Sequence, residues 1–339
     1  MSEKNSEPWG TAAATGVGSM PGTDAREAAR TVLGTLDALP ALPELPARGP
    51  GADMIGRTVG LLAELYAAVE PSGWRVTDRA GRDTRRARAW MREDLDALEE
   101  FSQDRTGALK VSVVGPWTLA AALERRGGEA MLGDPGACRY LAESLAEGLG
   151  AHLAELRRRF PRARLVVQLD EPSLPSVLAG RVRTASKLRT HAPVDRAVVE
   201  STLRRLREGF PEPLVVHCCA PGVPVGSLRA GGADAVSLDL SLLTEREYEA
   251  VAEAIDAGVS LFAGVVPASG SDPAALSDPA SNVGGVRSLW RRLGFSPGLL
   301  AESVVITPTC GLAGASPAYA RAALAHCLRA AESLADNPE

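Results

Sequence analysis

Eight short apolar runs rich in β-branched residues alternate along this chain with longer amphipathic stretches rich in Ala, Leu, Arg and Glu. Such alternation is typical of a parallel sheet with helical connections, and eight units predict closure into a single (β/α)8 barrel, the TIM-barrel class of α/β fold. The second run is the weakest, because three prolines interrupt it. The expected strands are residues 12–17, 39–45, 110–114, 164–169, 214–218, 234–238, 260–266 and 304–307.

The barrel is expected to occupy residues 11–334 as one domain, with a disordered N-terminus at 1–10 and a frayed tail at 335–339. A long connection at 266–281 is rich in Pro, Ser, Gly and Asp. Long loops of this kind are often active-site lids, and a plain surface excursion is the alternative. The expected helical stretches are 24–36, 55–69, 83–102, 118–126, 135–160, 195–210, 245–257, 282–293 and 317–334.

Composition excludes several classes of partner and location. A net charge of −5 offers no broad basic surface, so no nucleic-acid partner is expected. The polar N-terminus is not followed by an apolar run, and no stretch reaches the ~20 apolar residues of a membrane span. Five scattered cysteines, an odd number, do not form a disulfide framework. These features predict a cytoplasmic protein without a membrane partner.

Three soft metal ligands stand at the ends of predicted strands. His217 and Cys219 close the fifth strand, and Cys310 follows the eighth. Alternate residues of a strand share a face, so His217 and Cys219 point the same way and Cys218 points to the opposite face. One imidazole and two thiolates suit Zn2+, and a loosely held fourth position makes such a site catalytic. The alternative is three buried core residues, because free cysteine is often buried.

Asp239 ends the strand next to the one that carries His217, so its carboxylate is the candidate fourth ligand until a substrate displaces it. A helix N-cap or a salt bridge is its alternative role. A zinc ion with two thiolates binds a substrate thiol, removes its proton and presents a thiolate at neutral pH. This donor set therefore favours alkyl transfer to sulfur over hydrolysis, for which histidine and carboxylate ligands are more usual.

Acidic and glycine-rich segments at other strand ends indicate the rest of the substrate. Asp170 follows the fourth strand, on the same face as Gln168, and Glu44 follows the second. Either carboxylate can bind a substrate ammonium group or pair with a structural arginine. The Gly16–Ser19 segment presents backbone N–H groups and a hydroxyl to an anion such as a carboxylate. A thiol that also carries ammonium and carboxylate groups is a thiol amino acid.

Several motifs occur together in the order found in one known family. They span residues 15–312, from a Gly-Val-Gly-Ser-Met-Pro segment near the start to a final Cys-Gly-Leu. The chain resembles the C-terminal catalytic zinc barrel of cobalamin-independent methionine synthase. The resemblance rests on residues 16–21 (GVGSMP), 115–118 (GPWT), 167–172 (VQLDEP), 217–219 (HCC), 234–239 (DAVSLD) and 307–312 (TPTCGL).

The resemblance implies an S-methyltransferase of methionine biosynthesis, in which zinc-bound homocysteine accepts a methyl group and leaves as methionine. It implies that Asp170 is a catalytic residue and that Glu44 and Asp170 hold the ammonium group. The remaining homocysteine contacts come from the backbone of Val17, Gly18 and Ser19. The implied zinc ligands are His217, Cys219, Asp239 and Cys310.

Departures from the family pattern fall on the methyl-donor side. The familiar enzyme has an additional N-terminal barrel that helps bind methyl-folate, without counterpart here. The family usually has Glu where this chain has Asp239, and an expected histidine is absent from residues 264–269. An expected tryptophan after Gly115-Pro116 is also missing, and Trp117 occupies a different place. The expected histidine would help to protonate the leaving folate. The methyl donor is therefore 5-methyltetrahydrofolate, or a methylated corrinoid protein, which leaves without needing that proton.

Two other functions remain open from the sequence. A related zinc methyltransferase would act on another thiol, such as coenzyme M, although Glu44 and Asp170 favour an amino acid. A non-catalytic barrel would bind zinc and homocysteine without turnover. A decarboxylase of the same superfamily would have no use for three soft ligands together.

Overall fold

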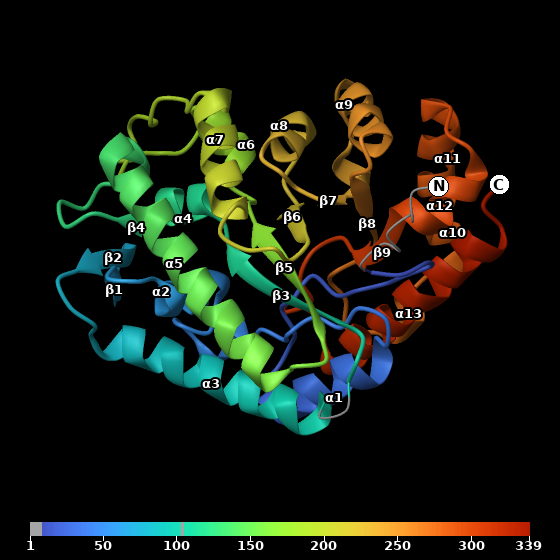
Figure 1. Cartoon of the computed structure of the whole chain (residues 1–339), viewed down its shortest axis with the longest axis horizontal. Helices are drawn as coiled ribbons and strands as arrows, with labels where there is room; N and C mark the ends of the chain where they lie inside the picture. Colours follow the sequence, from blue (N-terminus) through green and yellow to red (C-terminus); the bar gives the residue numbers. More distant parts are fainter. Residues whose placement is uncertain (1–8, 103–104) are drawn as a thin grey trace.

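Six parallel strands form a curled sheet at the centre of the computed structural model, which describes residues 9–102 and 105–339 (Figure 1). They pair in the order β3-β5-β6-β7-β8-β9, so the chain adds each new strand beside the previous one. This is the progression expected of a barrel, and it confirms the predicted α/β class. Their bounds are Ala108–Val114 (β3), Arg164–Asp170 (β5), Leu214–Cys218 (β6), Ala235–Asp239 (β7), Ser260–Val266 (β8) and Val304–Pro308 (β9).

The two N-terminal segments that were expected as strands complete the barrel through isolated bridges rather than regular ladders. The first segment pairs with β9, the second with β3, and the two pair with each other, so the circuit of backbone contacts closes. Proline lacks the N–H group that a ladder needs, which explains why Pro40 and Pro43 permit only isolated contacts in the second segment. The parallel bridges are Ala14 with Ile306, Ser19 with Glu44, and Ala41 with Lys110.

One buried apolar residue from each of the eight segments forms a separate core inside the barrel. Trp9 joins this cluster, and its ring meets that of Phe262 edge-on with centroids 5.1 Å apart. An interior filled in this way is a packed core and not a pore. The eight residues are Ala13, Leu39, Ala108, Val166, Val215, Ala235, Phe262 and Val305.

Helices lie around the outside of the strands (Figure 1). Several begin at an Asp or Ser cap, as Asp24 and Asp134 show by accepting hydrogen bonds from first-turn backbone N–H groups. The bounds are Ala25–Thr35 (α1), Met54–Leu61 (α2), Arg82–Ser102 (α3), Pro116–Ala122 (α4), Pro135–Arg159 (α5), Leu174–Leu178 (α6), Arg196–Arg207 (α7), Val225–Ala230 (α8), Glu245–Asp256 (α9), Pro279–Asn282 (α10), Gly284–Leu293 (α11), Leu300–Ser303 (α12) and Pro317–Asp336 (α13).

The helix expected over residues 55–69 is wrong in its second half. Helix α2 ends at Leu61, and Glu64 has a φ of +53°, which an α-helix cannot accommodate. The chain then forms an antiparallel hairpin of β1 (Tyr66–Glu70) and β2 (Gly73–Thr77). A two-residue strand, β4 (Leu123–Glu124), joins β2 to give a small second sheet beside the barrel.

The chain ends differ in how far they are described. Residues 1–8 of the expected disordered segment lie outside the described residues, whereas Trp9 is buried. Helix α13 continues to Asp336, two residues beyond the expected end of the barrel. The connection at 266–281 is tied to α13, because Tyr319 Oη donates to the Pro267 carbonyl at 3.1 Å and Ser316 N to the Gly270 carbonyl at 2.9 Å. None of the described helices has the length and apolar character of a membrane span.

Candidate metal centre and acceptor site

Three ligand side chains converge at the C-terminal ends of β6 and β9. The ligand atoms of His217, Cys219 and Cys310 lie within 4.8 Å of one another. The sulfur atoms of Cys219 and Cys310 are 3.2 Å apart, and both cysteines are free thiols. The loop after β9 also lies close to the Gly16–Ser19 segment, since a β-carbon on Gly311 would overlap the hydroxyl of Ser19. The structure therefore brings together the three soft ligands that the sequence placed on separate strands.

The orientation of His217 fits a metal ligand. Its Nδ1 lies 2.9 Å from Ser237 Oγ on the neighbouring strand β7, which holds the ring in one orientation. Its Nε2 is buried and has no hydrogen-bond partner within the described part of the chain. Buried polar atoms are nearly always partnered, because an unsatisfied one costs about 1–3 kcal/mol. A metal ion bound to Nε2, with Nδ1 held by a hydroxyl, resolves this deficit.

The two thiols of the cluster differ from the cysteine between them. Cys219 shares a hydrogen bond with Cys310, which lowers the pKa of Cys310 and raises that of Cys219. A thiolate beside an imidazole is the form in which cysteine binds metal. Cys218 instead faces the outer core, where burial raises its pKa to about 12 and keeps it a neutral thiol. The predicted alternation of the strand is confirmed.

Asp239 is not part of this cluster in the structure. Its Oδ1 accepts hydrogen bonds from the backbone N of Ser241 at 2.9 Å and from the Ser241 hydroxyl at 2.7 Å. These contacts cap a short 3-10 helix, Leu240–Leu242. The capping role weighed from the sequence is thus the one observed.

A cavity of about 200 Å³ adjoins the three ligands and contains every substrate-binding residue expected from the sequence. Two buried carboxylates, Glu44 and Asp170, line it together with the Val17–Ser19 segment. Pro46, Asp53 and Met54 also line the cavity and were not expected there. The cavity therefore places groups that can bind an amino acid next to ligands that can hold a metal ion for a thiol.

A buried polar network fixes the segment at Val17. Its carbonyl oxygen accepts hydrogen bonds from Lys110 Nζ at 3.0 Å, Gln168 Nε2 at 2.9 Å and Ser112 Oγ at 3.3 Å. Gln168 Nε2 also donates to Asp170 Oδ1 at 2.7 Å, which confirms that these two side chains share a face. Burial raises the pKa of Asp170, and the nearby His217 and this hydrogen bond oppose the rise.

Glu44 is held by a chain of buried charges that the sequence did not reveal. Arg57 Nε lies 3.6 Å from Glu44 Oε1, and the same guanidinium contacts Asp94 through Nη1. Asp94 also pairs with Arg48 at 2.7 Å. Burial raises the pKa of Glu44 to about 7, with Arg57 lowering it and Asp170 raising it. Glu44 is therefore poised between its neutral and ionised forms near neutral pH.

Glu171, the residue after Asp170, faces away from the cavity and anchors α4. Its carboxylate accepts from the backbone N of Trp117 at 2.9 Å and of Thr118 at 2.7 Å, and from the Thr118 hydroxyl at 2.8 Å. Burial raises its pKa to about 7 against these hydrogen bonds. Asp170 therefore faces the cavity, whereas the neighbouring Glu171 holds the start of α4 in the barrel wall.

Comparison with known proteins decides the family. Residues 11–333 match the family described as "Cobalamin-independent synthase, Catalytic domain". The chain belongs to this family. A search of curated proteins found no significant match.

Two solved structures share the fold of this synthase-family chain. A B12-independent methionine synthase from Shewanella sp. W3-18-1, solved with selenomethionine, is 13% identical with a TM-score of 0.59. The match covers 95% of this chain and 97% of that one. A methyltransferase from Methanosarcina mazei is 14% identical with a TM-score of 0.51, over 95% of each chain. The family assignment makes this protein a methyltransferase and confirms the resemblance drawn from the motifs.

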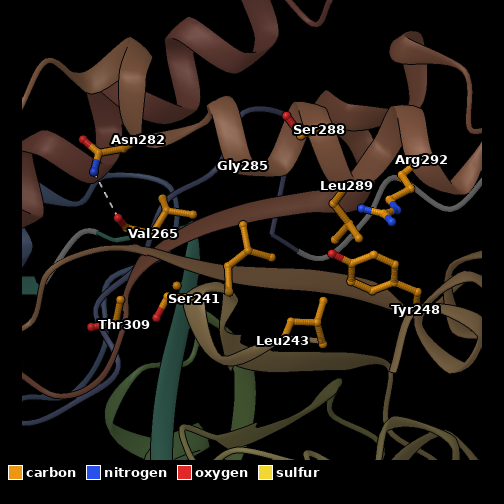
Figure 2. Close-up of a pocket in the computed structure, with 12 residues that line it drawn as sticks. Ser241, Leu243, Tyr248, Val265, Asn282, Gly285, Ser288, Leu289, Arg292 and Thr309 are labelled. Carbon is orange, nitrogen blue, oxygen red and sulfur yellow. Dashed lines mark hydrogen bonds between the residues drawn. The ribbon is translucent and has the colours of Figure 1, made fainter. Parts of the chain in front are cut away.

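A second hollow of the methyltransferase begins beside the three candidate metal ligands, where Thr309 directly precedes Cys310. It encloses about 430 Å³ between the ends of β7 and β8 and helix α11. Figure 2 shows Thr309 and Ser241 at one end and Tyr248 with Arg292 at the other. Leucine side chains form much of the wall between them. This hollow is larger and more open to solvent than the cavity of about 200 Å³ beside the three ligands.

Proposed function

We propose that this protein transfers a methyl group to the thiol of homocysteine and so produces methionine, with Zn2+ held by His217, Cys219 and Cys310. The observation that carries the proposal is the single cavity in which those three ligands face Glu44 and Asp170. A metal ion held by soft ligands suits a thiol substrate, and buried carboxylates suit an ammonium group. Zinc, when bound, lowers the pKa of a coordinated thiol and keeps it as the nucleophilic thiolate.

The remaining groups of homocysteine are matched by this chain's own residues. Glu44 and Asp170 bind the ammonium group, and the backbone N–H groups of Gly18 and Ser19 are the candidates for the carboxylate. Asp239 is the ligand that the incoming thiol displaces, which requires it to leave its cap on Ser241. Asp239→Asn is then expected to lower zinc retention without homocysteine, with little effect once homocysteine is bound.

The methyl group moves without its bonding electrons. A carbon–sulfur bond forms as the donor–methyl bond breaks, the thiol loses its proton, and the donor keeps the electron pair. A folate donor must be protonated to leave, whereas a corrinoid donor leaves without a proton. Residues 264–269, at and after the end of β8, contain no histidine or acid. This feature favours a methylated corrinoid protein over 5-methyltetrahydrofolate as the donor.

The first test is the zinc content of the purified protein, read together with the zinc X-ray absorption edge. We expect about one zinc per chain and one additional sulfur ligand after homocysteine is added. Methyl transfer from methylcobalamin and from 5-methyltetrahydrofolate is then compared. Zinc that does not respond to homocysteine would remove the proposal. Zinc and homocysteine binding without turnover from either donor would favour a non-catalytic barrel.

The alternative acceptor is tested in the same assay. Coenzyme M has a thiol but no ammonium group, so it gives the buried carboxylates of Glu44 and Asp170 no cation to bind. The missing charge-assisted hydrogen bonds cost affinity. We expect homocysteine to be methylated in strong preference to coenzyme M, and equal rates would favour the other thiol methyltransferase.

A further inference from the structure

Lys110 is a fully buried cation that the proposed chemistry does not use. It is one of three lysines in the chain, and its side chain is 0% exposed inside the barrel. It forms no ion pair with any carboxylate in the part of the chain that the structure describes; Nζ donates instead to the Val17 carbonyl and to Gln168 Oε1. Burial lowers its pKa to about 8, while Asp170 and Glu44 raise it. The ammonium form therefore predominates at neutral pH.

Lys110 anchors the oxygen end of the Gln168 amide, and the Val17 carbonyl and Asp170 accept from its nitrogen end. An ammonium group can only donate hydrogen bonds, and an ionised carboxylate can only accept them. The amide between them therefore places Oε1 on Lys110 and Nε2 on Asp170. The reversed amide would set two donors against each other at Lys110 and two acceptors at Asp170. Only the observed orientation satisfies both neighbours.

The orientation of the Gln168 amide affects the cavity through Asp170. Gln168 Nε2 bonds Oδ1 of this carboxylate and at the same time bonds the Val17 carbonyl. No hydrogen bond from a described residue reaches the other oxygen, Oδ2, and Asp170 lines the cavity. The carboxylate is thereby held in place with one oxygen available to a ligand.

We propose that Lys110 is a positioning residue which, through Gln168, sets Asp170 to receive the ammonium group of the acceptor, and so makes the site select thiols that carry an α-amino group. The inference rests on the proposed function for the identity of the acceptor. Lys110 does not touch the reacting atoms and acts only through Gln168 and the Val17 carbonyl. Its removal leaves Gln168 Oε1 without its donor and takes one donor from the Val17 carbonyl, so the amide and the Asp170 carboxylate are held less firmly.

The test compares two acceptors in the zinc-loaded enzyme with Lys110→Met. Homocysteine is compared with 4-mercaptobutanoate, which has the same thiol and carboxylate but no amino group. We expect the preference for homocysteine, measured as the ratio of kcat/KM values, to fall roughly tenfold or more through KM, the size of one lost charge-assisted contact. Lys187→Met, the same change at an exposed lysine, should leave the ratio unchanged.

A second variant guards against poor folding of the first. Gln168→Glu keeps the size of the side chain and a partner for Lys110 but removes the N–H donor from Asp170. It should lower the same preference, while zinc content stays near one per chain. An unchanged ratio in both folded variants overturns the inference. So does a loss that is equal for both acceptors, because that indicates a general structural role.

The amide itself gives a readout that does not depend on the reaction. In the wild-type protein the two Gln168 side-chain N–H protons should exchange slowly with solvent, and in Lys110→Met they should exchange markedly faster. Rapid exchange in the wild type would overturn the orientation. Wild-type enzyme that shows this protection but does not bind homocysteine would contradict the proposed function and the named acceptor. The hydrogen-bond network around Gln168 would still be supported.

Discussion

Gly115 and Glu171 are in such close contact that no side chain fits between them. A β-carbon on Gly115 would overlap the carboxylate of Glu171, the group that bonds the first N–H groups of α4. Gly115 follows the last residue of β3, and Glu171 follows Asp170 at the end of β5. The contact therefore joins the two strands at the level of the acceptor cavity.

Gly115→Ala should displace Glu171 and, with it, the adjoining Asp170. We expect a loss of about 2 kcal/mol or more in the free energy of unfolding, together with weaker homocysteine binding, because buried overlap forces backbone shifts. Urea unfolding and calorimetric titration measure the two effects. Gly150→Ala in α5, where the added carbon meets nothing within 4 Å, should leave stability unchanged or raised. Equal stability of the two variants would contradict the assignment.

Loss of one metal ligand should abolish activity and remove most of the zinc. His217→Ala takes away the only nitrogen ligand in the cluster, and Cys310→Ser replaces a thiolate with a weak hydroxyl ligand. Metal analysis of the purified variants and a methyl-transfer assay are the measurements. Cys218→Ala, on the opposite face of the same strand, should keep its zinc. Full zinc retention by both ligand variants would contradict the assignment of these residues as zinc ligands.

His152 should make the fold sensitive to mild acid. Burial, with a smaller effect of Arg57, lowers its pKa to about 4, below the ordinary value of 6.5. Between these values the unfolded chain binds the proton and the folded chain does not, so stability falls as the pH falls from about 6.5 to 4. The full effect is about 3 kcal/mol, at about 1.4 kcal/mol per pKa unit.

Unfolding of the wild type and of His152→Gln at pH 7 and pH 4.5 isolates this contribution. The variant lacks the titrating group, so the gap between the two proteins should shift in its favour in acid. A constant gap would show that His152 titrates normally in the folded protein.

Homocysteine affinity should rise with pH through Glu44. The pKa of this carboxyl is raised to about 7 in the free protein, and an ammonium ligand requires the ionised form. Below pH 7 binding must release a proton from Glu44, so affinity should increase up to about tenfold per pH unit and level off above pH 7. Calorimetric titration at pH 6, 7 and 8 measures this dependence.

Glu44→Gln supplies the comparison, because an amide does not titrate. Its affinity should be lower at pH 8 and should change less between pH 6 and pH 8. 4-Mercaptobutanoate, which has no ammonium group, should show little of the Glu44-dependent rise in either protein. A wild-type slope that survives in Glu44→Gln would assign the titration to another group, such as the substrate thiol.

The regular strands were predictable because apolar β-branched runs buried on both faces identify themselves in a sequence. The group of three candidate metal ligands was predictable for a similar reason, since a histidine and a cysteine two residues apart on one strand share a face. The hairpin from Tyr66 was missed because the apolar run before it suits a helix equally well. Its signal was the Pro-Ser-Gly turn at 71–73, followed by alternating Trp74 and Val76.

The buried cations were harder to predict because their partners lie far away in the sequence. Arg57 on α2 meets Glu44 and Asp94 only after the fold forms. Lys110 gave one local signal, since Lys110 and Ser112 both place polar groups on the inward face of an otherwise apolar strand. Such a pattern in a buried strand indicates a polar network within the barrel.

One of the isolated bridges that close the barrel, between Ser19 and Glu44, lies at the acceptor site. Ser19 and Glu44 belong to the two irregular segments, and two backbone hydrogen bonds, Glu44 N to Gly18 O at 3.2 Å and Met20 N to Glu44 O at 2.8 Å, join them. If the proposed function holds, homocysteine contacts both segments at once. It then adds contacts at a junction of the barrel that has an isolated bridge in place of a regular strand ladder. The empty protein should then exchange its amides at 18–20 and 44 faster than the occupied one. Substrate binding then also reinforces the barrel wall at this junction.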